Sequence, residues 1–165
     1  MDIDAIPDGT LVFVDANIFI YHFAGVSDKC TRFLQRVLKG EVKAVVSTIV
    51  MAELIHRRMV AEAVEKGFVT LRNAVRKLKE NPRIVKLLSQ YSRDVEAILA
   101  LPIIVEPITR DDIISSGQLR ERYGLMTNDS LNLACMERLG IRDIATRDED
   151  FEAVEWINVW KPDDI

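Results

Sequence analysis

One acidic residue stands in the middle of an otherwise apolar and uncharged stretch near the N-terminus. Residues 11–21 read LVFVDANIFIY, and Asp15 is the only carboxylate among them. The run before Asp15 predicts a buried β-strand with Asp15 at its carboxyl end, where open α/β sheets bind ligands. Because an unpaired buried charge is unfavourable, Asp15 is expected to face a cation or hydrogen-bond donors.

A second strand followed by a helix repeats this arrangement. The pattern predicts a buried strand over residues 43–47 and a helix that begins at Thr48. Glu53 is the only ionisable residue between Val45 and Ile55. Two such units, each with one embedded carboxylate, indicate a shared site at one edge of the sheet.

Two further acidic residues occupy comparable places in the second half of the chain. A helix capped by Thr127 or Asn128 would place Asp129 in its first turn, where an interaction with the helix dipole is an alternative to a functional role. A short strand over residues 143–146 precedes Asp148. Strands that alternate with helices predict an α/β fold with a mainly parallel sheet and helices on both faces.

The segment between these halves is helical in pattern and rich in positive charge. Apolar residues at every third or fourth position over residues 59–100 predict a pair of antiparallel helices, the second starting at Asn81-Pro82. Seven basic residues and one acidic residue lie between Lys66 and Lys86. Both a solvated helix surface and a face that contacts a nucleic-acid backbone agree with this pattern.

Composition limits the class of protein. At 165 residues and 48% hydrophobic, the chain can bury a core as one domain without disulfides. Cys30 and Cys135 form no metal-ligand or disulfide pattern, and no apolar run approaches the roughly 18 residues of a membrane helix. We therefore expect a cytoplasmic protein without a membrane segment. The net charge of −4 argues against a whole surface that binds nucleic acid.

Four acids thus follow predicted strands or begin helices: Asp15, Glu53, Asp129 and Asp148. Oxygen ligands without His or Cys favour a hard cation, which predicts Mg²⁺ or Mn²⁺ and not zinc. A divalent cation would also relieve the repulsion among clustered carboxylates. Such a site is suited to hydrolysis of phosphodiester bonds.

These acids lie in four motifs that resemble a known family. Residues 14–18 (VDANI), 47–54 (STIVMAEL), 128–131 (NDSL) and 146–151 (TRDEDF) look like the ordered acidic motifs of PIN domains, including the VapC toxins. The resemblance spans the chain and keeps the motif order. It implies a three-layer α/β/α PIN-like fold, a single PIN-like domain over residues 1–165, and a Mg²⁺- or Mn²⁺-dependent endoribonuclease.

The resemblance also implies roles for individual residues. Matching motif positions make four acids the metal-binding and catalytic residues: Asp15, Glu53, Asp129 and Asp148. Asn17 and Thr146 would support these acids, and Asp150 either assists Asp148 or caps the turn before Phe151. VapC-type relatives form homodimers and are silenced by an antitoxin, so an RNA substrate, a homodimer and an antitoxin partner are expected for a toxin. PIN domains also process ribosomal RNA.

Two alternatives belong to other functional classes. A HAD-like phosphatase also places an Asp after its first strand, but it normally has a second Asp two residues later, where this chain has Asn17. A non-catalytic PIN module would use the same fold only to bind RNA or a protein.

Overall fold

A five-stranded parallel sheet forms the centre of the protein, and the computed structural model describes all residues from 1 to 165. All four pairs of neighbouring strands are parallel. In spatial order the strands are β3 (Ile103–Glu106), β2 (Lys43–Ser47), β1 (Leu11–Val14), β4 (Asp143–Ala145) and β5 (Asn158–Trp160). The central position of β1 explains its uncharged sequence, because Val12, Phe13 and Val14 are completely buried.

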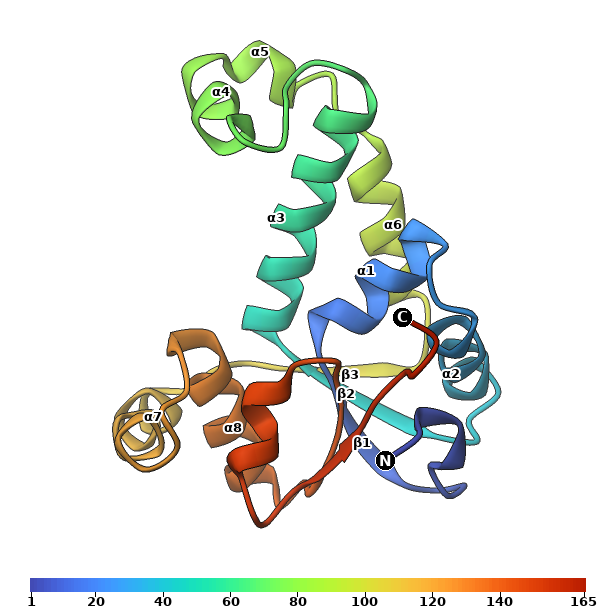
Figure 1. The fold of residues 1–165 in the computed structure, drawn as a ribbon, viewed down its shortest axis with the longest axis vertical. Helices are drawn as coiled ribbons and strands as arrows, with labels where there is room; N and C mark the ends of the chain where they lie inside the picture. The colour runs from blue at the N-terminus through green and yellow to red at the C-terminus, as the bar shows by residue number, and fades with distance from the viewer.

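Helices cover both faces of the sheet, which confirms the predicted three-layer fold (Figure 1). On one side lie α1 (Ala16–Ala24) and α2 (Asp28–Leu38), and on the other lie α7 (Arg110–Tyr123) and α8 (Thr127–Leu139). Two short 3₁₀ helices, η1 (Ile3–Ala5) and η2 (Glu149–Ala153), lie near the chain ends. None of the helices has the combination of length and apolar composition that crossing a bilayer requires.

The helical pair over residues 59–100 differs from the prediction in its boundaries. The pair consists of α3 (Thr48–Glu65) and α6 (Gln90–Leu99), which pack together and rise above the sheet. Between them lie two short helices, α4 (Ala74–Glu80) and α5 (Pro82–Val85). The prediction of an unbroken first helix up to Asn81 is wrong, because the chain turns after α3 at Gly67, whose φ of 70° lies in the left-handed region.

We call residues 66–88, which carry α4 and α5, the arm. The arm has a small hydrophobic core of its own, separate from the main core under the sheet. Its buried members are Ala63, Val69, Ala74, Leu78 and Leu88. The arm is therefore a packed structure at the end of the α3/α6 stalk, not an extended loop (Figure 1).

A buried carboxylate fastens the arm to the stalk. The Glu62 side chain, on α3, accepts hydrogen bonds of 2.9 Å from the backbone N–H groups of Ser89 and Tyr91 at the start of α6. It also lies 2.7 Å from the ammonium of Lys66, which donates a hydrogen bond to the carbonyl of Leu87. These contacts satisfy N–H groups that a helix start leaves without partners, and they set where α6 begins.

Two helices begin in different ways. Ser27 caps α2, because its hydroxyl accepts a hydrogen bond of 3.0 Å from the N–H of Cys30. The predicted cap of α8 at Thr127 or Asn128 is wrong. Met126 occupies the cap position of α8 and makes no side-chain cap bond, so Thr127 is the first helical residue.

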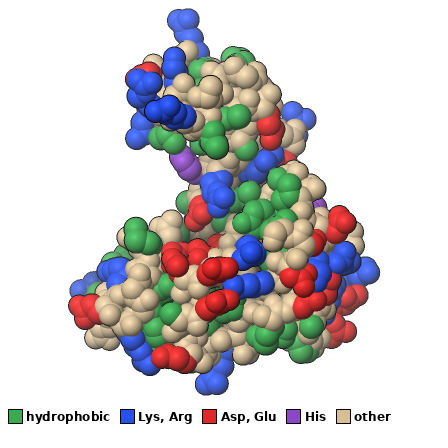
Figure 2. Space-filling view, in the orientation of Figure 1, with side chains coloured by type: hydrophobic (Ala, Val, Ile, Leu, Met, Phe, Trp, Pro, Cys, Tyr) green, Lys and Arg blue, Asp and Glu red, His purple; other side chains and the backbone are tan.

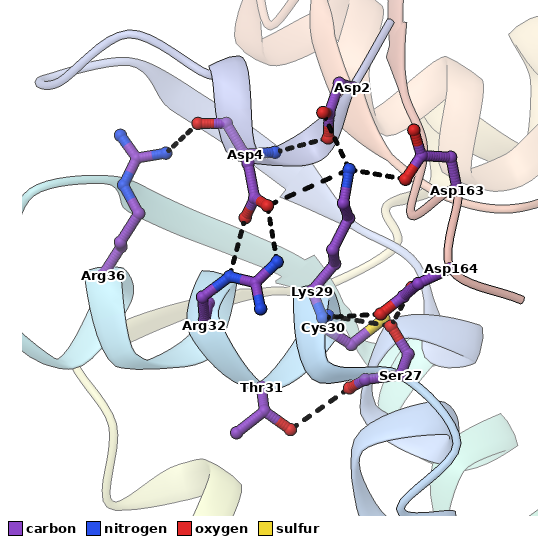
Figure 3. Close-up of polar contacts among 10 residues, drawn as sticks. All are labelled: Asp2, Asp4, Ser27, Lys29, Cys30, Thr31, Arg32, Arg36, Asp163 and Asp164. Carbon is purple, nitrogen blue, oxygen red and sulfur yellow. Dashed lines mark hydrogen bonds and ion pairs between the residues drawn. The ribbon is translucent and has the colours of Figure 1, made fainter.

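Both chain ends are held against α2 by charged groups (Figure 3). The Lys29 ammonium lies 2.7 Å from Asp2 and 2.5 Å from Asp163. Arg32 pairs with Asp4 at 2.6 Å. The basic side chains of α2 are therefore matched by acids from the two ends of the chain.

Candidate functional site

The first elements of the site are the carboxyl ends of two adjacent strands. Val14 of β1 is in register with Ala145 of β4, so the residues that follow them, Asp15 and Thr146, emerge side by side. Parallel strands place such residues at the same sheet edge, as the sequence analysis assumed. Asp15 also caps α1, since its Oδ1 accepts a hydrogen bond of 2.6 Å from the N–H of Ala16.

The second carboxylate oxygen of Asp15 is held by two side chains. Oδ2 accepts hydrogen bonds of 2.6 Å from the Thr146 hydroxyl and 2.5 Å from the Asn17 amide. Thr146 is completely buried and Asn17 is 9% exposed, so these donors have little freedom to turn away. The orientation of the Asp15 carboxylate is consequently fixed by the fold.

The same two supporting residues order the loop after β4. The Thr146 hydroxyl oxygen accepts a hydrogen bond of 3.0 Å from the N–H of Asp148, and the Asn17 side-chain oxygen accepts one of 3.3 Å from the N–H of Arg147. Asp148 in turn caps η2, because its Oδ1 accepts from the N–H of Asp150 at 2.9 Å.

Three carboxylates approach one another closely at this edge. Asp129, Asp148 and Asp150 each offer an oxygen, and these oxygens all lie within 4.8 Å of one another. Asp129 comes from the first turn of α8, while the other two come from the loop after β4. A hollow of about 390 Å³ opens beside them. Its lining residues are Glu53, Met126, Thr127, Asn128, Asp129 and Asp148.

Charge repulsion connects these acids to Asp15 and Glu53. Burial raises the pKa of Asp15 to about 6, with further increases from the charges of Glu53 and Asp148 and an opposing effect of the Thr146 hydrogen bond. Burial also raises the pKa of Asp129 to about 6, as do the charges of Asp148, Asp15 and Glu53. Each acid therefore lies within electrostatic reach of the others.

We call the five acids Asp15, Glu53, Asp129, Asp148 and Asp150 the acidic site. The structure brings them to one sheet edge together with Asn17 and Thr146, whereas their roles as ligands stay predictions. Of the two alternatives for Asp150, the cap of the turn before Phe151 is wrong, because Asp148 caps that turn and accepts the Asp150 N–H, while the Asp150 carboxylate belongs to the close group. No sequence pattern marked Met126, an exposed residue that lines the hollow.

The donor chemistry of the acidic site fits a divalent cation. Every side chain that could bind a metal there offers carboxylate oxygen, and neither His nor Cys lines the hollow. Hard cations prefer this donor set. A cation would also offset the repulsion that raises the pKa of Asp15 and Asp129.

Comparison with known proteins places this geometry in a family. The model of the PIN domain matches residues 12–157. Ribonuclease VapC6 of Methanocaldococcus jannaschii is 23% identical over 152 residues, which cover 91% of this chain and 96% of that protein.

Solved structures show the same fold. VapBC2 from Rickettsia felis, bound to a DNA fragment from its promoter, gives a TM-score of 0.62 at 16% identity and covers 93% of this chain and 100% of that chain. VapC20 from Mycobacterium tuberculosis, a sarcin-ricin loop cleaving toxin, gives a TM-score of 0.57 at 17% identity. This match covers 88% of this chain and 96% of that chain. Because the family model matches most of its length, the chain belongs to the PIN domain family.

Proposed function

We propose that this protein is a metal-dependent endoribonuclease that hydrolyses RNA phosphodiester bonds, and that it is the toxin of a VapBC-type toxin–antitoxin pair. The observation that carries the proposal is the group of three carboxylates within 4.8 Å, beside Asp15 and Glu53. Membership of the PIN family and a relative named as a ribonuclease support it.

In this proposal four acids bind Mg²⁺ or Mn²⁺: Asp15, Glu53, Asp129 and Asp148. A bound divalent cation would lower the pKa of water and stabilise the charge that develops on the phosphate. The protein orients the carboxylates. Thr146 and Asn17 hold one oxygen of Asp15, and the loop that presents Asp148 is bonded to the same pair.

The surroundings of the acidic site leave room for a nucleic-acid strand. The hollow beside the carboxylates is bordered by Met126, Thr127 and Asn128, all of which are exposed. A phosphodiester could therefore approach from solvent without displacing the core. Asp150 is exposed at the rim and serves in this proposal as an accessory to Asp148.

The proposed partners follow from the relatives. Several similar structures are named as VapBC or toxin–antitoxin complexes, which supports an antitoxin protein as partner of this chain. We also propose that the protein forms a homodimer. We further propose that it acts on RNA in the cytoplasm. Light scattering after size-exclusion chromatography, with and without a co-expressed neighbouring gene product, tests both assemblies.

The two alternatives have less support. PIN membership argues against the HAD-like phosphatase, which would also need an acid where Asn17 stands. A non-catalytic module would have no use for the close group of three carboxylates, in which burial and then the charges of Asp148, Asp15 and Glu53 raise the pKa of Asp129 to about 6.

Incubation of RNA with the purified protein and Mn²⁺ tests the nuclease. We expect the wild-type protein to cut RNA, and we expect Asp129→Asn or added EDTA to abolish cutting. Asp28→Asn is a matched control, because Asp28 is an exposed acid in the first turn of α2, as Asp129 is in the first turn of α8. Equal cutting by wild type and Asp129→Asn would assign the activity to a contaminant.

A further inference from the structure

The arm carries an unusual surplus of positive charge. It contains seven of the 22 basic residues of the chain and one of its 26 acidic residues. All seven basic side chains are exposed. Figure 2 shows Lys and Arg side chains gathered on the arm, above a region of the same face where Asp and Glu side chains gather. The two kinds of charge are thus separated along the molecule.

Most of this positive charge has no partner within the protein. Only Lys66, with Glu62, and Arg76, with Glu80, form ion pairs. The five others are Arg72, Lys77, Lys79, Arg83 and Lys86. In contrast, most basic residues outside the arm have an acidic partner, as Lys29 and Arg32 of α2 do in Figure 3. A surface that merely keeps the arm solvated would not need unpaired charges of one sign.

The acidic site lacks free positive charge of its own. Arg57 lies 3.4 Å from Glu53, and Arg147 lies 3.3 Å from Glu149, so the two nearby guanidinium groups are already paired. A polyanion that approaches the five carboxylates is repelled by them. Favourable contacts for the rest of such a ligand must come from another part of the surface.

A hollow that we call the arm groove lies at the base of the arm. Arg57, which contacts Glu53, lines this hollow of about 330 Å³ between α1, α3 and the arm. The lining residues of this arm groove are Ile20, His56, Arg57, Val60, Ala61, Leu71 and Val75. Leu71 is 78% exposed, so part of its apolar lining faces solvent. Apolar surface next to basic side chains suits a strand with unpaired bases and a phosphate backbone.

The length of α3 matches several nucleotides. Twelve residues separate Glu53 from the end of α3 at Glu65, which corresponds to about 18 Å at 1.5 Å per residue. One strand of a stacked duplex carries a charge every roughly 3.4 Å, so this distance spans about five phosphates in that geometry and fewer in an extended single strand. A single strand bound at the acidic site can therefore reach the arm.

We propose that the arm binds the phosphate backbone of the RNA strand on one side of the cleaved linkage. The five unpaired basic residues contact phosphates, and the arm groove receives unpaired bases. This inference rests on the proposed function, since it takes RNA as the substrate. It assigns substrate binding to a surface distinct from the acids that act on the linkage.

Anisotropy of a fluorescent single-stranded RNA of about 20 nucleotides, longer than most single-strand binding sites, measures binding. EDTA is present so that no cleavage occurs. The test variant is Arg72→Gln with Lys79→Gln, and the control is Lys43→Gln with Arg142→Gln. Both control residues are exposed, make no ion pair and lie at the amino ends of β2 and β4, opposite the acidic site.

The arm variant is expected to bind roughly tenfold more weakly than wild type, with a salt slope less steep by about 1.4, because two phosphate contacts are lost. The control is expected to change by less than about twofold. Equal affinities of the arm variant and wild type, or an equal loss in the control, would overturn the proposal. Polyglutamate that binds as tightly as RNA, with the same dependence on Arg72 and Lys79, would assign the arm to an acidic protein.

Cleavage in Mn²⁺ separates this proposal from the proposed function. Binding that depends on the arm without any cleavage by wild type would contradict the nuclease and leave the arm as an RNA-binding surface. Cleavage and binding that are both unaffected by the arm substitutions would contradict the arm proposal and leave the nuclease intact. Melting temperatures of both double variants show that the exposed substitutions leave the fold unchanged.

Discussion

The Thr146 hydroxyl donates a 2.6 Å hydrogen bond to Oδ2 of Asp15, although 131 positions separate the two residues in sequence. The same hydroxyl oxygen accepts from the N–H of Asp148 at 3.0 Å. One buried side chain thus sets the relative positions of two members of the acidic site. The register between β1 and β4 brings Asp15 and Thr146 into contact, and this contact fixes the local geometry of the acidic site.

Replacement of this hydroxyl is the first prediction. Thr146→Val keeps the shape of the side chain but leaves the Asp148 N–H without its partner and Oδ2 of Asp15 with the Asn17 amide as its only donor. We expect kcat for RNA cleavage to fall by about tenfold or more, with stability lowered by about 1–3 kcal/mol. Steady-state cleavage and urea unfolding measure the two effects. Thr146→Ser retains the hydroxyl and should keep most activity; an equal loss in both variants would contradict the positioning role.

Stability of the metal-free protein should fall as the pH rises from about 4 to about 6. The folded-state pKa values of Asp15 and Asp129 are raised to about 6, so the folded protein binds more protons than the unfolded chain in this window. Stability therefore decreases with rising pH until both acids are ionised. Unfolding in EDTA across this range measures the slope.

Asp129→Asn removes one of the repelling charges and should weaken that pH dependence. Near pH 7 without metal, we expect a higher melting temperature than in wild type, by about 2–4 °C for each kcal/mol of repulsion relieved. No hydrogen bond is lost, since the structure shows none to the Asp129 carboxylate. The control Asp28→Asn should retain the wild-type slope. An unchanged slope in Asp129→Asn would show that its carboxylate is not repelled.

Addition of Mn²⁺ should reverse the order of stability. A cation that binds only the folded protein stabilises it by about 2.7 kcal/mol at one hundred times its dissociation constant. We expect wild type to gain melting temperature in Mn²⁺ and Asp129→Asn to gain much less. The same titration at acid pH should show weaker binding, because protons compete for the carboxylates. Equal gains in the two proteins would exclude Asp129 as a ligand.

Glu62 should make the stability of the α3/α6 stalk and the arm sensitive to acid. Burial alone would raise the pKa of Glu62, but hydrogen bonds from Lys66 and the N–H groups of Tyr91 and Ser89 lower it to about 2. Its contribution to stability is therefore present above about pH 4.5 and lost as the pH falls towards 2. Glu62→Gln should be less stable than wild type near pH 7, and its stability should fall less as the pH is lowered. Urea unfolding near pH 7 and at acid pH measures both effects. Glu65→Gln, on the exposed side of α3, is the control.

The elements that the sequence predicted well are those with local signals. The apolar run before Asp15 specified a central strand, because a strand buried on both faces has no polar positions. Gly124 and Gly140 marked the ends of α7 and α8, where the backbone adopts left-handed values. Each acid of the candidate site followed such an element, so its place at the sheet edge could be anticipated.

The arm shows what the sequence pattern could not supply. Apolar spacing predicted that the first helix of the pair runs unbroken to Asn81, whereas the chain turns at Gly67 and forms the separate short helix α4. The start of α6 depends on hydrogen bonds that its N–H groups donate to Glu62, a residue more than twenty positions earlier. The sequence favoured Asp148 over Asp150 as a ligand, but it could not show that both carboxylates reach the same group from one turn of chain.

The α3/α6 stalk contains a buried ion pair that supports the arm. Arg58 and Asp94 are each only 6% exposed, and their Nε and Oδ2 atoms lie 2.7 Å apart. Gln90 donates a further bond of 2.8 Å to Asp94, and the guanidinium of Arg58 lies 5.4 Å from the ring centre of Phe23. The pair therefore links α6 to α3, and α3 to α1.

Removal of one partner of the Arg58–Asp94 pair should lower the stability of the protein far more than removal of both. Asp94→Leu leaves the buried Arg58 charge without its main partner, and we expect a loss of about 3–5 kcal/mol in urea unfolding. The double variant Arg58→Met with Asp94→Leu removes both charges and should recover most of that loss. If the double variant is as unstable as Asp94→Leu, the loss of stability comes from lost packing and not from the unpaired Arg58 charge. Because the stalk sets where the arm lies, Asp94→Leu should also weaken RNA binding, whereas the double variant should restore it.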